Sequence, residues 1–427
     1  MALISLDIHY CLQYLIWFIT VVVVHSFIRK FLKPARTLVP EPPSPPALPF
    51  IGHLHLVSSV LPKSFQELAR VYGPLMGIRL GASSCLVVSN AAVAKEIFKT
   101  QELNFCSRPE FGSSEYFIYR GSRFVLAQYG DYWRFMKKLC MTRLLAVPQL
   151  DKFANIRDQE KVKLVESVIK CCREGKTCDL SSEFTTLTNN TICRMTMSTR
   201  CSGSDNDAAE IKELIRTCLE LSGKISVGDV LGPFKVLDFS GNGNKLKAAL
   251  LKYDRLVDRI IKEHQEKESE GFDGNQKMDL LDILLEVYRD PTAEVKISMK
   301  DIKSFLLAKT RVLVNVYAVM RDPDSWANPN EFDPERFLGG SDEKIGEHQM
   351  EFKGQNFRFL PFGSGRRGCP GASLAMLVMH AAVGSLVQCF DWEVKGGGKV
   401  DLSPGPGFAT EMAHPLVCYP TVSSNPF

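Results

Sequence analysis

The sequence lacks a strong excess of either charge and lacks any pair of cysteines with two residues between them. Its 52 basic and 48 acidic residues leave a net charge of +4, which does not indicate a nucleic-acid partner. The 13 cysteines are scattered and odd in number, so neither a disulfide framework nor a cysteine zinc site is indicated. We therefore expect reduced, mostly buried thiols in a domain that faces the cytosol.

A long apolar run near the start of the chain indicates a membrane anchor. Residues 10–28 are apolar with four polar exceptions, and a helix of that length spans about 28 Å, close to the hydrocarbon thickness of a bilayer. Basic residues follow the run at once, so the positive-inside rule places the body of the protein in the cytosol. A cleaved signal peptide is the alternative, which is disfavoured because the basic residues come after the apolar run.

A basic and proline-rich segment separates this run from the rest of the chain. Residues 40–49 contain six prolines, which favours a stiff, extended linker. The sequence therefore predicts a membrane anchor over residues 1–28, a linker over residues 29–49 and one further domain over residues 50–427.

The further domain is predicted to be mainly helical with a small β region. Leu75–Leu80 and Cys85–Ser89 flank a turn and predict a hairpin, after which Asn90 caps a short helix over residues 91–100. The β-branched residues of 311–320 predict a strand. Helices are predicted at residues 65–72, 129–138, 246–264, 278–288 and 372–390.

The most informative segment is a glycine-rich loop around one cysteine. Residues 361–371 read Pro-Phe-Gly-Ser-Gly-Arg-Arg-Gly-Cys-Pro-Gly. Such a loop suits an iron-ligating thiolate, because glycines let the backbone turn tightly and aim amide groups at the sulfur of Cys369. Arg367 can reach a carboxylate of haem, and Phe362 is placed to keep water from the sulfur. The alternative is a surface loop around a buried structural cysteine.

The pattern Phe-x-x-Gly-x-Arg-x-Cys-x-Gly resembles the haem-binding loop of the cytochrome P450 superfamily. The resemblance implies that the cofactor is haem b, iron protoporphyrin IX, and that the Cys369 sulfur is the protein ligand of the iron. The haem-binding residues that it implies in this loop are Phe362, Gly363, Gly365, Arg367, Cys369 and Gly371.

A tryptophan and a lysine on a predicted helix extend this resemblance. Trp133 and Lys137 are four residues apart and share one helix face. The family places a Trp-x-x-x-Arg/Lys pair here to hold a haem propionate, so the resemblance implies the same role for this pair. Taken without the cysteine loop, the two residues predict only a packed tryptophan beside a solvated lysine.

Two features that the resemblance leads us to expect are missing. The chain has no Ala-Gly-x-Asp/Glu-Thr string, which is the acid–alcohol pair that the family places over the iron, so no catalytic residue is assigned. Its two Glu-x-x-Arg strings begin at Glu213 and Glu286, upstream of the family's position, and we interpret them as solvated helix faces. The join at Leu307/Ala308 therefore predicts an internal deletion of about 100 residues.

The predicted deletion has two structural consequences. Arg336 lies in a Pro-Glu-Arg-Phe string whose arginine pairs with the Glu-x-x-Arg helix in the family, so we expect an unpaired cation there. The alternative is a surface loop whose arginine is solvated. The apolar helix over residues 372–390 packs on the central helix in the family, so we expect one of its faces to lose its cover.

The resemblance implies a cytochrome P450 fold, mainly α with a small β region and one N-terminal transmembrane helix, that lacks the central distal helix and the Glu-x-x-Arg helix. It implies a monooxygenase, an oxidoreductase that a reductase supplies with electrons from NADPH while the thiolate ligand favours O–O cleavage. The implied location is the endoplasmic reticulum membrane, with the catalytic domain in the cytosol.

Three strings, Phe105–Pro109, Trp133–Met141 and Gln388–Trp392, resemble the flavonoid-oxidising group of plant P450 enzymes. The expected substrate is therefore a small hydrophobic plant metabolite of flavonoid type. Two alternatives stay open. One is a non-catalytic splice variant, pseudogene product or faulty gene model that binds haem weakly or not at all, and the other is an unrelated membrane-anchored helical protein.

Removal of residues 1–28 is expected to release the protein from membranes, because the apolar run at 10–28 is the main insertion signal. Fractionation with an alkaline wash measures this, and weak peripheral attachment through Phe31 and Leu32 is compatible with it. Full retention of the shortened protein in the washed membrane pellet contradicts a single-span anchor.

Overall fold

The structure is a computed structural model that describes most of the chain. The described residues are 2–31, 41–49, 51–81, 83–108, 124, 127–200, 214, 217, 242–269, 278–306, 314–337, 352, 354–406 and 411–423. The predicted join at Leu307/Ala308 and the string at Glu213 lie outside them.

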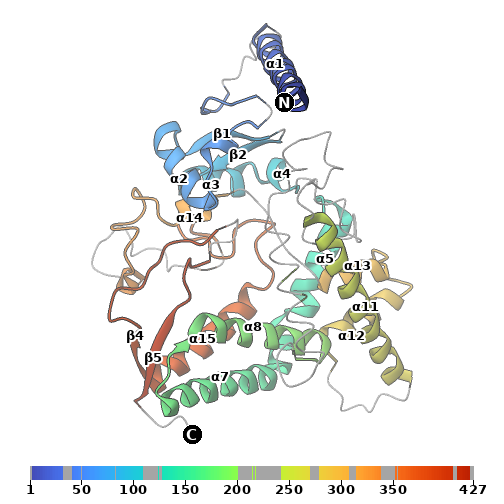
Figure 1. The fold of residues 1–427 in the computed structure, drawn as a ribbon. Coiled ribbons are helices and arrows are strands. Elements are labelled where there is room, and N and C mark those ends of the chain that lie inside the picture. Colours follow the sequence, from blue (N-terminus) through green and yellow to red (C-terminus); the bar gives the residue numbers. More distant parts are fainter. Residues whose placement is uncertain are drawn as a thin grey trace.

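The described elements form a small N-terminal β region above a larger helical body (Figure 1). The N-terminal elements are α1 (Ala2–Phe31), η1 (Leu54–Leu56), α2 (Leu61–Tyr72), β1 (Leu75–Leu80), β2 (Ser83–Val88), α3 (Ala91–Lys95), the π-helix η2 (Glu96–Thr100) and α4 (Glu102–Phe105). The helical body contains α5 (Asp131–Leu139), the π-helix η4 (Cys140–Leu144), α6 (Val147–Lys152), α7 (Ala154–Glu174), α8 (Leu180–Met197), α11 (Asn242–Ser269), α12 (Leu280–Arg289) and α13 (Met299–Leu306). After these come α14 (Val316–Val319), η6 (Pro334–Phe337) and α15 (Ala372–Cys389).

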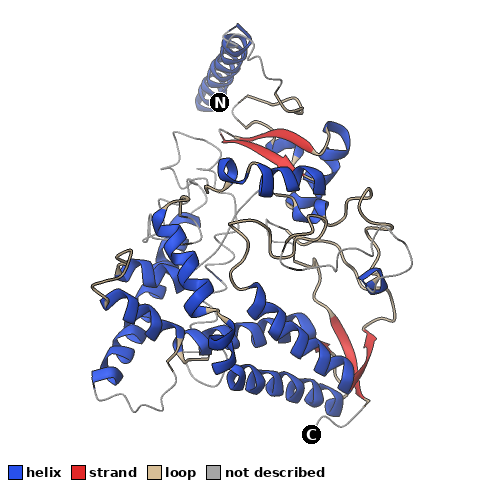
Figure 2. Ribbon diagram, turned by 180° about the vertical axis from the view of Figure 1, so that it is seen from behind, coloured by secondary structure: helices blue, strands red, loops and turns tan. Residues whose placement is uncertain are grey.

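Two small antiparallel sheets accompany the helices (Figure 2). The first is the predicted hairpin of β1 and β2, with Leu75 opposite Val88. The second has the order β3-β5-β4 and joins β3 (Cys178–Asp179), β4 (Phe390–Val394) and β5 (Val417–Val422). The Asn90 side chain accepts a hydrogen bond of 3.0 Å from the Val93 amide and caps α3 as predicted.

Separate apolar clusters support the two halves of the body. One lies among α5, α8, α11 and α12 and includes Trp133, Met136 and Leu284. The other lies among α7, α8, α15, β4 and β5 and includes Val168 and Phe390. The cluster around Trp133 fixes α5, from which the tryptophan and lysine of the predicted site project.

Three expectations from the sequence are wrong. Residues 316–319 form the helix α14, and before it Val314 makes only a single parallel bridge to Val88, so the strand predicted at 311–320 is not formed there. Cys193 is disulfide-bonded, so the cysteines are not all reduced. The third concerns Arg336.

Arg336 is not an unpaired cation. Its guanidinium donates to four backbone carbonyls at 3.0–3.3 Å, and its side chain is 15% exposed. The carbonyls belong to Ala327, Asn328, Glu331 and Asp333. Because the local loop supplies these acceptors, the arginine needs no distant carboxylate.

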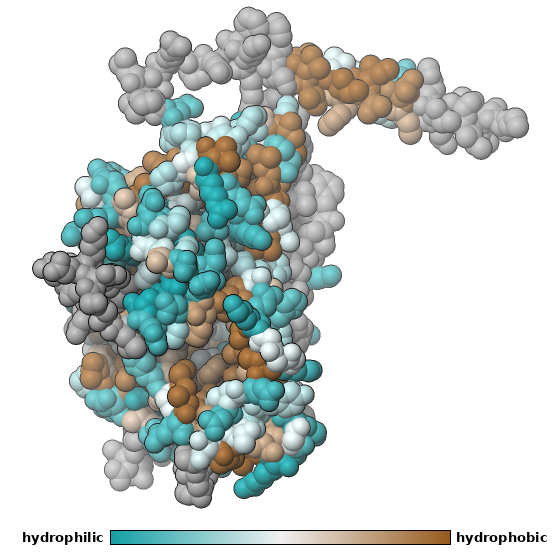
Figure 3. Space-filling model, turned by 90° about the vertical axis from the view of Figure 1, so that its left-hand side faces the viewer, coloured by the Kyte–Doolittle hydropathy of each residue, from teal (hydrophilic) through white to brown (hydrophobic). Residues whose placement is uncertain are grey.

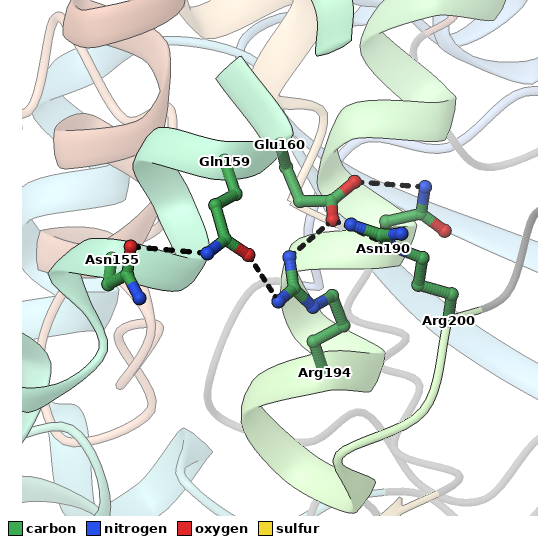
Figure 4. A network of polar contacts seen from close by, with 6 residues as sticks. All are labelled: Asn155, Gln159, Glu160, Asn190, Arg194 and Arg200. Atoms are coloured by element: carbon green, nitrogen blue, oxygen red, sulfur yellow. Dashed lines mark hydrogen bonds and ion pairs between the residues drawn. The ribbon is translucent and has the colours of Figure 1, made fainter. Parts of the chain in front are cut away.

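A buried carboxylate ties α7 to the end of α8 (Figure 4). Glu160 is 2% exposed and accepts hydrogen bonds from Arg194 at 2.6 Å and from Arg200 at 3.0 Å. Asn190 donates to its second oxygen at 3.2 Å. Burial acts to raise the pKa of Glu160, but the two arginines outweigh it and lower the pKa. The carboxylate is therefore charged at neutral pH and holds the two helices together.

One face of α15 is apolar and exposed. Val378, Ala382 and Leu386 are buried on the opposite face, and α15 packs on α7. The exposed side chains are Leu377 (45%), Met379 (45%), Val383 (48%) and Val387 (69%). This agrees with the expectation that the helix has a face without cover.

Two helical segments among the described residues are strongly apolar. Helix α15 is long and apolar enough to cross a membrane, whereas Tyr10–Val24 within α1 is a shorter apolar stretch. The buried face of α15 is the pattern of a core helix. The apolar side chains of α1 stand clear of the body of the molecule (Figure 3), and the N-terminal span stays a prediction.

A half-buried histidine joins α11 to the start of α12. His264 places Nδ1 at 2.8 Å from the Ile260 carbonyl and Nε2 at 2.8 Å from Asp279 Oδ2. Both partners are acceptors, so the ring makes both hydrogen bonds only when it is protonated. Asp279 also caps α12 through the Asp282 amide at 3.0 Å and accepts from the Ser198 hydroxyl at 2.8 Å. Burial acts to lower the pKa of His264, but Asp279 outweighs it and the pKa is raised.

The His264→Gln variant is expected to be less stable than the unmodified chain by about 1–3 kcal/mol below pH ~6.5, the pKa of a free histidine. The difference is expected to shrink as the pH rises through the raised pKa of the folded protein, because the stabilising proton is then lost. Denaturant unfolding below pH ~6.5 and above the raised pKa of the folded protein measures this difference in stability. The control is His55→Gln, which changes an exposed histidine. A difference that does not change with pH contradicts a charged His264.

Candidate functional site

The cysteine loop is a series of tight turns in front of α15. The Gly368 amide donates to the Gly365 carbonyl at 2.9 Å, and the Cys369 amide donates to the Phe362 carbonyl at 3.0 Å. Gly365 has a φ of 64°, in the region that favours glycine. These two amides are used by carbonyls within the loop, and the predicted approach of loop amides to the sulfur stays a prediction. The Cys369 thiol is exposed.

The aromatic ring that the sequence predicts beside the sulfur packs on another phenylalanine, and its role as a shield stays a prediction. Phe362 is half-buried and lies edge-on to Phe352, with ring centroids 6.2 Å apart. Because Cys369 is exposed, the alternative of a buried structural cysteine is also wrong. Gly363 has a φ of 71°, and a Cβ on Gly371 would lie 3.8 Å from the Cys369 sulfur. Gly371 thus leaves the space next to the sulfur free of a side chain, whereas a Cβ on Gly363 would meet no atom within 4 Å.

Helix α5 brings its tryptophan and lysine to this loop. Lys137 Nζ donates to the Gly368 carbonyl at 2.5 Å, although 231 residues separate them. The Arg367 guanidinium lies over the Trp133 ring, 4.4 Å from its centroid, a cation–π arrangement. The structure therefore brings the predicted residues of α5 and of the loop together, and Lys137 is not simply solvated.

The Arg367 side chain is fixed in place with one donor unused. Its Nε donates to the Cys106 carbonyl at 2.6 Å and its Nη2 to the Ala127 carbonyl at 2.7 Å. Its Nη1 is buried and has no hydrogen-bond partner in the part of the chain that the structure describes. A buried guanidinium with an unused donor is prepared for an anionic acceptor.

A second arginine, which the sequence analysis missed, lies beside this group. Arg108 is 6% exposed. Burial lowers its pKa to about 10, and the nearby Arg367 acts in the same direction. The only signal in the sequence was its place in the string Phe105–Pro109, which gave a resemblance to a group of enzymes but no cofactor role for the arginine.

The electrostatics of the site favour a negatively charged ligand. Burial lowers the pKa of Arg367. Burial also lowers the pKa of Lys137, with the thiols of Cys140 and Cys369 acting against it and Arg367 adding to it. Three cations with lowered pKa values gather around the loop, and an anion that reaches them relieves both desolvation and mutual repulsion.

Comparison with known proteins decides the family. The model of the cytochrome P450 family matches residues 42–309 and 304–419. The chain belongs to the cytochrome P450 family. It is 35% identical to 3,9-dihydroxypterocarpan 6A-monooxygenase of Glycine max, over 90% of this chain and 94% of that protein. It is 31% identical to beta-amyrin 24-hydroxylase of Glycine max, over 98% of each chain.

A solved structure supports the mostly helical P450 fold. A zebra fish cytochrome P450 crystallised with progesterone superposes with a TM-score of 0.65 at 19% identity, over 84% of this chain and 99% of that chain. The family makes this protein an oxidoreductase of the monooxygenase type, and its cofactor is haem b. The expected alternative of an unrelated helical protein is therefore wrong.

The described residues around the cysteine loop are suited to binding haem. Haem carries two carboxylates, and three cations are placed to bind them. They are Arg367 with its unused Nη1, the buried Arg108, and Lys137. The exposed Cys369 thiol, beside Gly371, leaves room for a flat ring to approach the sulfur.

The Cys369→Ala variant is expected to lose any thiolate-type spectrum of reduced, carbon monoxide-treated protein, because no other sulfur in the described loop replaces it. Haem content and the difference spectrum measure this. The control is Cys172→Ala, a half-buried cysteine on α7 that is not part of the loop. Survival of the thiolate spectrum in Cys369→Ala contradicts the assignment.

Proposed function

We propose that this protein is a haem-thiolate monooxygenase of plant secondary metabolism in which Cys369 ligates the iron. The observation that carries the proposal is the meeting of α5 with the cysteine loop, through Lys137 on the Gly368 carbonyl and Arg367 on Trp133. When bound, haem supplies the one-electron and O₂ chemistry of the reaction.

The chain's own residues have distinct roles in this proposal. Cys369 binds iron as the thiolate, next to the Gly368 carbonyl that accepts a hydrogen bond from Lys137. Arg367 and Arg108 hold the carboxylates of the cofactor, with Lys137 and the Trp133 indole beside them. Gly363, Gly365 and Gly371 keep the loop compact enough for this approach.

The proposed substrate is a small hydrophobic, flavonoid-like plant metabolite. The strings Phe105–Pro109, Trp133–Met141 and Gln388–Trp392 support it, and so does the similarity to a Glycine max enzyme named for 3,9-dihydroxypterocarpan. The proposed electron donor is an NADPH-dependent reductase. Residues 1–28 are proposed to anchor the protein in the endoplasmic reticulum membrane with residues 50–427 in the cytosol, as the apolar stretch Tyr10–Val24 supports.

An internal deletion is the second part of the proposal. The alignment with the pterocarpan monooxygenase extends over 482 positions while covering 90% of this 427-residue chain, so about 100 positions have no counterpart here. The family model matches in two pieces that meet at residues 304–309. Both observations support a missing block at Leu307/Ala308, as does the exposed apolar face of α15.

The deletion favours a second candidate function for the 427-residue chain, a non-catalytic haem-binding product. The acid–alcohol string that would deliver protons is absent from the sequence, and the uncovered face of α15 exposes apolar surface. The fold and the Cys369 site then belong to the monooxygenase family, while coupled turnover requires the missing block.

Two proteins test this pair of proposals. One is the 427-residue chain and the other carries, between Leu307 and Ala308, the aligned block of the Glycine max pterocarpan monooxygenase. Haem stoichiometry, aggregation and oxidation of a flavonoid with NADPH and reductase are measured in each. We expect poor haem retention, aggregation and no coupled turnover from the 427-residue chain, and retained haem in the restored chain.

The opposite results are equally informative. Stoichiometric haem and flavonoid hydroxylation by the 427-residue chain would overturn the non-catalytic candidate and show that another segment replaces the block. A restored chain that folds but takes up no haem contradicts the site at Cys369.

A further inference from the structure

The cysteine loop is also held by a carboxylate on α4, in addition to its contact with α5. Glu102 accepts hydrogen bonds from the amide and from the guanidinium of Arg366, the latter at 3.1 Å between Nε and Oε2. Its side chain is 21% exposed. Among the described residues, no other carboxylate is hydrogen-bonded to residues 361–371.

The turn at Gly365 is seated directly on this carboxylate. A Cβ built on Gly365 would lie 2.5 Å from Glu102 Oε1 and 2.7 Å from the Phe98 carbonyl oxygen. The backbone there leaves no space for a side chain, and its φ of 64° favours glycine in addition. The Phe98 carbonyl and the positive φ restrict this position to glycine, and Glu102 holds the turn in place against α4.

The position of the turn is passed on to the cysteine. The Gly365 carbonyl accepts from the Gly368 amide at 2.9 Å, and the Gly368 carbonyl in turn accepts from Lys137 Nζ. Cys369 is the next residue. Three hydrogen bonds thus connect Glu102 on α4 to Lys137 on α5 through the loop that carries the thiol: Arg366 to Glu102, Gly368 to Gly365 and Lys137 to Gly368.

The charge of Glu102 also matches its surroundings. Arg366 pairs with it and donates to the Tyr129 hydroxyl at 3.1 Å. Without the carboxylate, Arg366 would add a further uncompensated cation beside Arg367.

We propose that Glu102 is a positioning residue that fixes the Gly365 turn and so the approach of the Cys369 sulfur to the haem iron. The consequence for haem rests on the proposed function, whereas the contact itself does not. Removing the carboxylate frees the Arg366 amide and lets the loop relax, which lowers haem affinity and the fraction of iron that keeps its thiolate.

The test compares the unmodified full-length chain in detergent with Glu102→Ala, Glu102→Gln and Glu96→Ala. Glu96 is an exposed acid on the neighbouring η2 and serves as the matched control. Hydrogen exchange of the peptide that contains residues 361–371 is measured without haem. Haem titration, followed through quenching of tryptophan fluorescence and the carbon monoxide difference spectrum, is measured on the same proteins.

In Glu102→Ala we expect exchange at the Arg366 amide to be about tenfold faster and haem to bind about 10- to 100-fold more weakly, with a smaller thiolate fraction. Glu102→Gln keeps an acceptor and is expected to restore most of the exchange protection, and Glu96→Ala is expected to match the unmodified chain.

Unchanged exchange in Glu102→Ala overturns the proposal. So does faster exchange with unchanged haem affinity and thiolate fraction, because Glu102 would then only stabilise the fold. If the unmodified chain retains too little haem to titrate, as expected above, the restored chain is used for the haem measurements. A restored chain that takes up no haem contradicts the proposed function, while the exchange result still decides the contact.

Discussion

The contact between α5 and the cysteine loop is the constraint on which the site depends. Lys137 reaches the Gly368 carbonyl and Arg367 covers the Trp133 ring, so each element supplies one cation to the other. The helix is fixed by the apolar cluster around Met136 and Leu284. The loop has no such core of its own, and its glycine turns take their positions from α5 and α4. The chemistry at Cys369 therefore depends on packing more than 200 residues away in sequence.

The features that local sequence determines were predictable. The Asn90 cap, the hairpin of β1 and β2 and the helix α15 were placed correctly, because capping groups and hydrophobic periodicity act within a few residues. The strand predicted at 311–320 was wrong because β propensity is weak where few partner strands exist. There, an asparagine cap at Asn315 starts the short helix α14 instead.

Within the site, sequence patterns identified the residue types but not their polar partners. Arg108 was missed because it belongs to no cofactor motif and is marked only by its burial beside Arg367. The partner of Arg336 was sought in a distant helix, whereas four neighbouring carbonyls satisfy it. Backbone carbonyls are invisible in a sequence pattern, and they are the acceptors for Arg336, Arg367 and Lys137 alike.

The sheet order β3-β5-β4 has a consequence for synthesis. Cys178 on β3 lies opposite Cys418 on β5 in the strand register. The Leu416 amide donates to the Ser181 hydroxyl at the start of α8. A ribosome releases α7 and α8 long before β5, so this side of the body waits through more than half of translation for its central strand. During that interval the apolar side chains that later meet α15 are accessible to chaperones.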